Sequence, residues 1–213
     1  MTRILVFGDS ITAGSYDHEE GGWVNRLRKF LDVKVLTESK FSYRIYNLGI
    51  SGDTTEGLLH RLESEAKNRI KETEDNVIIF QIGLNDSILI LDKGKLITSS
   101  KKFSKNIQKL VKISSKITKN IIFVGLTPVN ESKVVPIPWR REAAYKNEHI
   151  RKYDYIIKEV CNKNNVKFVE MFQEIGKVNY YDKLLEDGVH PNSEGHQKMF
   201  EIIKDFLIDN KMI

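Results

Sequence analysis

Short apolar runs alternate along this chain with longer stretches whose apolar residues recur at helical spacing. The runs are rich in β-branched and aromatic residues, as in Val77-Ile78-Ile79-Phe80. They cover Arg3–Phe7, Tyr43–Leu48, Asn76–Ile82, Asn120–Leu126 and Val166–Glu170. Because their apolar positions are continuous rather than alternating, we expect strands that are buried on both faces, which is typical of a parallel sheet.

Between these runs, apolar residues recur every three or four positions, with charged residues on the opposite face. The apolar stripes are Trp23, Leu27, Phe30 and Leu31; Leu58, Leu59, Leu62 and Ala66; Phe103, Ile107, Leu110, Val111 and Ile117; and Met199, Phe200, Ile203, Phe206 and Leu207. Such alternation predicts an α/β fold, in which helices cover both faces of a parallel sheet. No repeat or linker interrupts it, so we expect one domain over residues 1–213.

Glycines and polar residues follow the first four predicted strands. The segments are Gly8-Asp9-Ser10, Gly49-Ile50-Ser51-Gly52-Asp53, Gly83-Leu84-Asn85-Asp86 and Thr127-Pro128. The carboxyl ends of parallel strands gather at one edge of the sheet, where α/β proteins bind their ligands. We therefore expect these groups to share a site.

The longest irregular segment is Val129–Tyr145, which contains Pro136, Pro138 and Trp139-Arg140-Arg141. A segment of this length is a candidate lid or substrate loop. Whether it covers a substrate, contacts a second copy of the chain in a homo-oligomer, or is plain surface stays open.

Composition limits the classes of function. The chain has 213 residues, 40% hydrophobic and 30% charged, which is a globular balance. No apolar run approaches the roughly 18–20 residues that span a bilayer, and the apolar N-terminus is too short for a signal peptide. We therefore expect a cytoplasmic protein without stable membrane insertion.

The charged residues and the single cysteine exclude further classes. The net charge of +5 is spread along the chain without interleaved aromatics, so no nucleic-acid partner is expected. Cys161 is the only cysteine, which excludes an internal disulfide, and its apolar helical surroundings indicate a structural thiol. No cysteine cluster or HExxH spacing occurs, so we expect neither a metal nor another cofactor.

Ser10, His190 and Asp187 supply the parts of a nucleophilic triad. A serine hydroxyl needs a base to remove its proton, and a neutral imidazole is available near pH 7. Asp187 lies three residues before His190, and Gly188 between them helps the chain turn. The carboxylate is then placed to fix the imidazole tautomer and to stabilise the imidazolium.

Acyl transfer also requires hydrogen-bond donors for an oxyanion. The predicted strand ends offer the backbone N–H groups of Ser10 and Gly52 and the side-chain amide of Asn85. Taken singly, each motif is as easily a turn or a cap, and Asp86 is a candidate cap for the segment that follows it. Their succession at consecutive strand ends favours a catalytic site.

These residues carry a resemblance to a known family. The chain resembles the GDSL-like esterases and lipases, also called SGNH hydrolases, whose four sequence blocks contain Ser, Gly, Asn and His. The matching positions are Ser10, Gly52, Asn85 and His190, and the blocks extend over nearly the whole chain. The first block reads Gly-Asp-Ser-Ile instead of Gly-Asp-Ser-Leu, which changes one apolar residue beyond the nucleophile.

The resemblance implies a three-layer α/β/α sandwich with a five-stranded parallel sheet of flavodoxin-like order. It also implies metal-free hydrolysis of a small-molecule ester through an acyl-serine intermediate on Ser10. His190 and Asp187 would complete the triad, and Ser10, Gly52 and Asn85 the oxyanion hole. Asp9, Asp53, Asp86 and His196 are expected to be structural.

The leaving group and the acyl chain are not fixed by these motifs. The compact chain favours a short acyl or acetyl group, while an acyl thioester or a lysophospholipid remains open as substrate. A different class, a non-catalytic flavodoxin-like binding protein, would leave Asn85 and the Asp187/His190 pair without a role.

Overall fold

The computed structural model describes residues 1–38 and 42–213, and its centre is a five-stranded parallel sheet. The strands are β1 (Thr2–Gly8), β2 (Tyr43–Gly49), β3 (Asp75–Gln81), β6 (Asn120–Val124) and β8 (Lys167–Val169). Their order, β2-β1-β3-β6-β8, confirms the predicted flavodoxin-like arrangement. In this order the topological switch point, where ligands bind, lies between β1 and β3.

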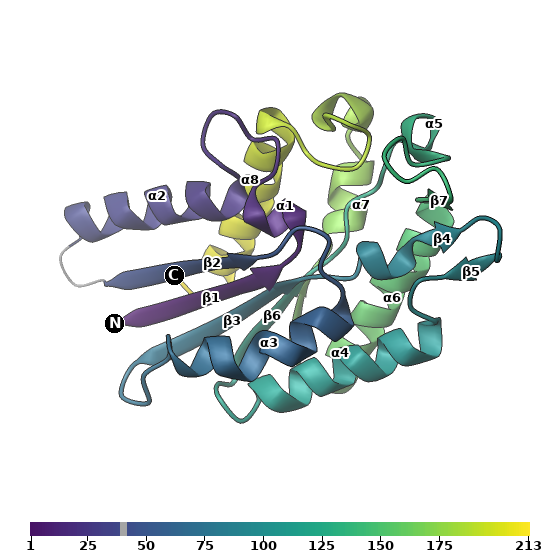
Figure 1. The fold of residues 1–213 in the computed structure, drawn as a ribbon. Helices are drawn as coiled ribbons and strands as arrows, with labels where there is room; N and C mark the ends of the chain where they lie inside the picture. Colours follow the sequence, from purple (N-terminus) through teal and green to yellow (C-terminus); the bar gives the residue numbers. More distant parts are fainter. Residues whose placement is uncertain (39–41) are drawn as a thin grey trace.

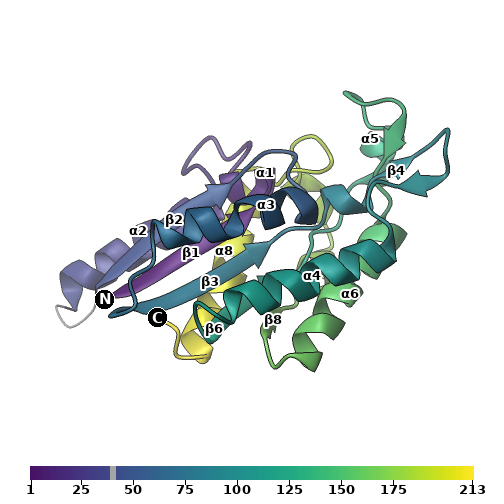
Figure 2. The same cartoon turned by 60° about the horizontal axis from the view of Figure 1, so that its bottom comes forward.

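Helices cover both faces of the sheet, which confirms the predicted three layers (Figure 1 and Figure 2). α2 (Trp23–Thr37) and α8 (Ser193–Asp209) pack together on one face. α3 (Thr55–Lys67), α4 (Ser100–Ser114) and α6 (Asn147–Lys163) lie side by side on the other. Among the described residues, no helix combines the length and the apolar character that crossing a bilayer requires.

The core directly beneath the carboxyl edge of the sheet is an aromatic row. Phe7, Phe80 and Phe123 occupy aligned positions on β1, β3 and β6. Their ring centroids lie 5.8 Å apart between Phe7 and Phe80, and 4.8 Å apart between Phe80 and Phe123. All three side chains are fully buried, so the strand ends that follow them rest on a close-packed base.

Two predicted strands are shorter than expected. β6 ends at Val124 rather than Leu126, because the N–H of Leu126 donates to the Asp154 carboxylate at 2.8 Å instead of continuing a ladder. β8 ends at Val169, because Glu170 is the residue that precedes α7 (Met171–Gly176). Ile117 lies beyond the end of α4, although it still packs against the core.

A second, three-stranded antiparallel sheet lies outside the predicted pattern. Its strands are β4 (Leu89–Ile90), β5 (Lys95–Leu96) and β7 (Ala143–Ala144), in the order β5-β4-β7. Figure 1 and Figure 2 show β4 and β5 extending away from the main sheet, beside α5 (Glu131–Val134).

The segment Val129–Tyr145, expected to be irregular, contains regular secondary structure. It contains α5, β7 and a bridge between Ile137 and Arg140. Its apolar side chains are buried at Val129, Val134, Ile137, Ala143 and Ala144. The remaining elements are α1 (Ser10–Ala13) and the 3-10 turns η1 (Asn85–Ser87) and η2 (Tyr181–Leu184).

Candidate active site

Ser10 is the first residue of α1, separated from the end of β1 only by Asp9. Asp9 caps this short helix by accepting the N–H of Ile11 at 3.0 Å. A side chain at Gly8 would place its Cβ 2.0 Å from Thr12 Oγ1 and 2.4 Å from the Gln81 carbonyl oxygen. Only glycine therefore lets α1 fold back so tightly over the sheet.

The structure brings Ser10, His190 and Asp187 into one hydrogen-bonded chain. Ser10 Oγ lies 2.8 Å from His190 Nε2, and His190 Nδ1 lies 2.7 Å from Asp187 Oδ2. With Nδ1 protonated and donating to the carboxylate, Nε2 is left as the acceptor for the Ser10 hydroxyl. This is the geometry of an activated serine nucleophile.

The turn between Asp187 and His190 fixes the carboxylate. Gly188 has φ of +93°, a left-handed conformation that a side chain would strain. Asp187 Oδ1 accepts the backbone N–H groups of Val189 and His190, both at 2.9 Å. Burial raises the pKa of Asp187, but the hydrogen bonds from His190 and Val189 outweigh it and leave the pKa below its usual value.

Gly52 and Asn85 line the same cavity as Ser10 and His190. Gly52 has φ of +77° in the turn after β2, and its N–H donates to no acceptor among the described residues. Asn85 begins η1 after β3, and its Nδ2 donates one hydrogen to the Asp53 carbonyl oxygen at 2.8 Å. All three residues expected to bind an oxyanion are thus gathered around one space.

The acidic residues beside these motifs hold the strand-end loops together. Asp86 accepts both the N–H and the hydroxyl of Thr55, at 2.9 and 2.7 Å, so it caps α3 and not the segment that follows it. Asp53 pairs with Arg61, whose guanidinium also donates to the carbonyl oxygens of Leu48 and Gly8. These contacts join the loops after β1, β2 and β3, which agrees with the structural roles expected of Asp53 and Asp86.

His196 lies behind the site and is fully buried. Its Nδ1 accepts the N–H of Trp23 at 3.3 Å, and its Nε2 lies 3.1 Å from the Ser15 carbonyl oxygen. Burial lowers the pKa of His196, so the neutral ring with a proton on Nε2 satisfies both contacts. Its position agrees with the structural role expected of it.

Tyr16, which the sequence did not single out, flanks the base. Its ring centroid lies 5.2 Å from that of His190, and its φ of +67° is unusual for a residue with a side chain. The loop is held by the buried Asp17, which accepts the N–H of Gly22 and pairs with Arg26 through both carboxylate oxygens. No local motif around Tyr16 signals this placement.

Trp139 and Tyr145 complete the lining. The cavity has a volume of about 330 Å³ and also includes Ser15 and Ser51. Trp139 is 57% exposed, and its ring centroid lies 6.3 Å from that of His190. The sequence singles out Trp139 as part of a candidate lid, whereas it marks Tyr145 only as the last residue of that segment.

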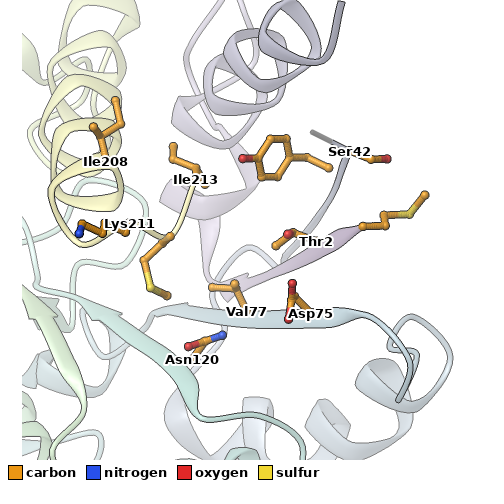
Figure 3. A pocket seen from close by; sticks show the side chains of 11 residues that line it. Thr2, Ser42, Asp75, Val77, Asn120, Ile208, Lys211 and Ile213 are labelled. Atoms are coloured by element: carbon orange, nitrogen blue, oxygen red, sulfur yellow. The ribbon is translucent and has the colours of Figure 1, made fainter. Parts of the chain in front are cut away.

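A larger cavity, of about 640 Å³, lies at the opposite edge of the sheet. Figure 3 shows Thr2 and Asp75 at the strand starts and Lys211 and Ile213 near the chain end around it. Its described lining includes no histidine that could activate a nucleophile. Its greater volume alone therefore does not make it the better candidate for an active site.

The single cysteine is not suited to act as a nucleophile. Cys161 is fully buried on α6, and burial, followed by the nearby Asp154 carboxylate, raises its pKa to about 12. A thiol of that pKa is protonated at neutral pH and is a poor nucleophile. Within residues 1–38 and 42–213, no three His, Cys, Asp or Glu side chains are grouped to hold a metal ion.

Comparison with known proteins gives the same assignment as the geometry. The model of the GDSL-like Lipase/Acylhydrolase family matches residues 6–198, which include every residue of the candidate site. A multidomain esterase of Ruminococcus flavefaciens is 28% identical over 229 residues, covering 92% of this chain and 27% of that protein. Esterase TesA of Pseudomonas aeruginosa is 34% identical over 85 residues, covering 40% of this chain and 38% of that protein. The chain thus spans well under half the length of these curated relatives.

Solved structures share the fold. A lipase/acylhydrolase from Enterococcus faecalis has a TM-score of 0.76 at 22% identity, over 97% of this chain and 95% of that chain. The acetylxylan esterase Axe2 from Geobacillus stearothermophilus has a TM-score of 0.69 at 24% identity, over 96% and 92%.

Proposed function

Because the chain belongs to the GDSL-like Lipase/Acylhydrolase family, we propose that it hydrolyses carboxylic esters through an acyl-serine intermediate on Ser10. One observation carries the proposal. The hydrogen-bonded chain Ser10–His190–Asp187 opens into the cavity that Gly52 and Asn85 also line. A nucleophile, its base and donors for the developing charge therefore face one space.

Acylation begins when Ser10 Oγ attacks the carbonyl carbon of the ester and His190 Nε2 takes the hydroxyl proton. The electron pair of the C=O bond moves to the oxygen, where the N–H groups of Ser10 and Gly52 and the Asn85 amide stabilise it. Asp187 stabilises the imidazolium. The intermediate collapses to acyl-serine, and His190 returns its proton to the departing alcohol.

Deacylation repeats these steps with water. His190 Nε2 takes a proton from water as the water oxygen attacks the acyl carbon, and the same donors hold the second oxyanion. Collapse breaks the bond to Ser10 Oγ, returns the proton to the serine and releases the carboxylic acid. The free enzyme is restored without any group beyond this chain and water.

The size of the cavity favours an ester with a short acyl group. The cavity volume of about 330 Å³ is near the lower end of the roughly 300–1,000 Å³ typical of ligand sites. Acetyl esters of carbohydrates belong in the first substrate panel, because acetylxylan esterases share the fold. Acyl thioesters and lysophospholipids test the two alternative leaving groups.

A chain-length series of p-nitrophenyl esters tests the proposal. We expect hydrolysis to peak at acetate or butyrate and to be lost in Ser10→Ala, while Ser64→Ala, on the exposed side of α3, retains full activity. Equal, slow hydrolysis by wild type and Ser10→Ala would refute the proposal that the protein is an esterase acting through Ser10. A peak at eight carbons or more would refute only the short-chain preference.

A further inference from the structure

Tyr145 makes a direct hydrogen bond to the oxyanion amide. Its hydroxyl donates to Asn85 Oδ1 at 2.8 Å, across 60 positions of sequence, and the tyrosine is only 5% exposed. We propose that Tyr145 is a positioning residue, which orients and polarises the Asn85 amide so that one Nδ2–H faces the oxyanion of ester hydrolysis. The inference deepens the proposed function and rests on it.

The contacts of Asn85 leave one donor uncommitted. A carboxamide has one oxygen and two N–H hydrogens. The oxygen accepts from Tyr145, and one hydrogen goes to the Asp53 carbonyl oxygen at 2.8 Å. Flipping the amide would set Asn85 Oδ1 against the Asp53 carbonyl oxygen, which has no hydrogen to donate. The second hydrogen is therefore the one available to the cavity.

The small sheet is what brings the two residues together. Asn85 precedes β4 by a few residues, and Tyr145 directly follows β7. Leu89 pairs with Ala144 across these strands, and the Tyr145 N–H donates to the Val134 carbonyl oxygen at 3.2 Å. The phenol is consequently held from both ends, by its backbone and by its hydroxyl. This arrangement gives the small sheet a function at the site.

The Tyr145 hydroxyl also remains a hydrogen-bond donor near neutral pH. Burial raises the pKa of its hydroxyl well above the usual value, and the Asp9 and Asp187 carboxylates raise it further. The hydroxyl therefore keeps its proton at neutral and moderately alkaline pH. Donation to Oδ1 withdraws electron density from the amide, which strengthens its N–H donors through hydrogen-bond cooperativity.

Tyr145→Phe removes the hydroxyl and keeps the buried ring. We expect kcat on p-nitrophenyl acetate to fall by about 5–30-fold, the equivalent of one lost hydrogen bond, with KM within twofold of wild type. In the Asn85→Ala background the same change should cost nothing further, because Tyr145 acts through Asn85. The matched control is Tyr153→Phe, since Tyr153 is a fully buried tyrosine whose hydroxyl donates to the Thr98 carbonyl oxygen rather than to Asn85.

A second readout does not depend on turnover. The side-chain N–H resonances of Asn85, identified by their loss in Asn85→Ala, should shift in Tyr145→Phe and not in Tyr153→Phe. Unshifted resonances, a KM effect without a kcat effect, or additive losses in the double variant would each overturn the inference. If the proposed function itself were wrong, turnover would not depend on Ser10, and that result is separate from all three.

Discussion

The five-stranded sheet and the three-stranded sheet contribute differently to the candidate site. The large sheet has parallel strands of three to seven residues, and its edge places Ser10, Gly52 and Asn85. The small sheet has antiparallel strands of two residues each, and it places Tyr145 and the Trp139 segment. The proposed nucleophile and oxyanion donors follow the strands of the large sheet, whereas the alignment of Asn85 and the rim of the cavity depend on strands of only two residues.

The ion pair that links the loops at the large sheet is also more buried than the ion pair beside the small sheet. Arg61 joins the ends of β1 and β2, with its side chain 13% exposed and that of its partner Asp53 9% exposed. Beside the small sheet, Arg140 pairs with Glu142 at 3.1 Å, but the two side chains are 41% and 61% exposed. We therefore expect changes at the large sheet to cost both activity and stability, and changes at the small sheet to affect the alignment of Asn85 or the binding of substrate.

The largest expected effect concerns the triad carried at the edge of the large sheet. Asp187→Asn should lower kcat by about 10⁴-fold, because the neutral amide no longer selects the imidazole tautomer that accepts the Ser10 proton. Steady-state kinetics measure the loss, and thermal unfolding verifies that the variant is folded. A loss below tenfold would mean that the carboxylate does not orient His190.

The next largest effect concerns the contribution of the ion pair at each sheet to the free energy of unfolding. Arg61→Met leaves the buried Asp53 carboxylate without its ion-pair partner and removes a donor to the Leu48 and Gly8 carbonyl oxygens, at a cost of about 3–5 kcal/mol in the free energy of unfolding. For a chain of this length, that corresponds to a fall in Tm of roughly 6–20 °C.

Arg140→Met is the matched control at the small sheet. Because that ion pair is exposed, we expect a change within about 0.5 kcal/mol. Equal losses of Tm in the two variants would remove the contrast between the sheets.

A smaller effect depends on pH. Burial raises the pKa of Asp9 to about 7 from 3.8, although the Ile11 N–H and His190 oppose the shift. The folded state therefore binds a proton that the unfolded state releases, so this contribution to stability is present below pH 4 and is lost as pH rises to 7. Asp9→Asn imitates the protonated acid, so its Tm relative to wild type should rise by several degrees between pH 5 and pH 8.

Thermal unfolding at the two pH values tests this expectation for Asp9. Asp154 has a pKa raised to about 7 by burial as well, so Asp9→Asn should flatten the decline of Tm without abolishing it. A Tm difference that is constant across the range would show that Asp9 does not gain a proton on folding.

The smallest effect concerns the rim. Trp139→Ala should leave Tm nearly unchanged, because the side chain is 57% exposed. We expect KM to rise by up to about tenfold for esters with bulky alcohol groups, since the indole flanks His190, which we propose protonates the leaving group. Trp139→Phe keeps an aromatic face and should recover most of the loss. An effect of equal size on methyl and bulky esters would argue against contact with the leaving group.

The sequence predicts the large sheet and fails on the small one for a physical reason. β1 and β3 are continuous apolar runs, so burial on both faces is visible in their composition. β4 and β7 have only two residues each, which is too few to show a period of apolar and polar positions.

The same distinction applies to the site. Ser10, Gly52, Asn85, Asp187 and His190 stand in recognisable local blocks, and the structure gathers all five. Tyr16 and Tyr145 reach the cavity through a strained turn and a two-residue strand, neither of which leaves a local signal.

Covalent labelling of Ser10 is the most direct test of the account. A fluorophosphonate should react once per chain, with Ser10 Oγ attacking phosphorus and fluoride leaving, and activity should fall in step with labelling. Mass spectrometry of the tryptic peptide Ile4–Arg26 should place the group on Ser10, and Ser10→Ala should remain unlabelled. Full turnover by enzyme labelled at Ser10, or inactivation with the label on another residue, would contradict the claim that Ser10 receives the acyl group.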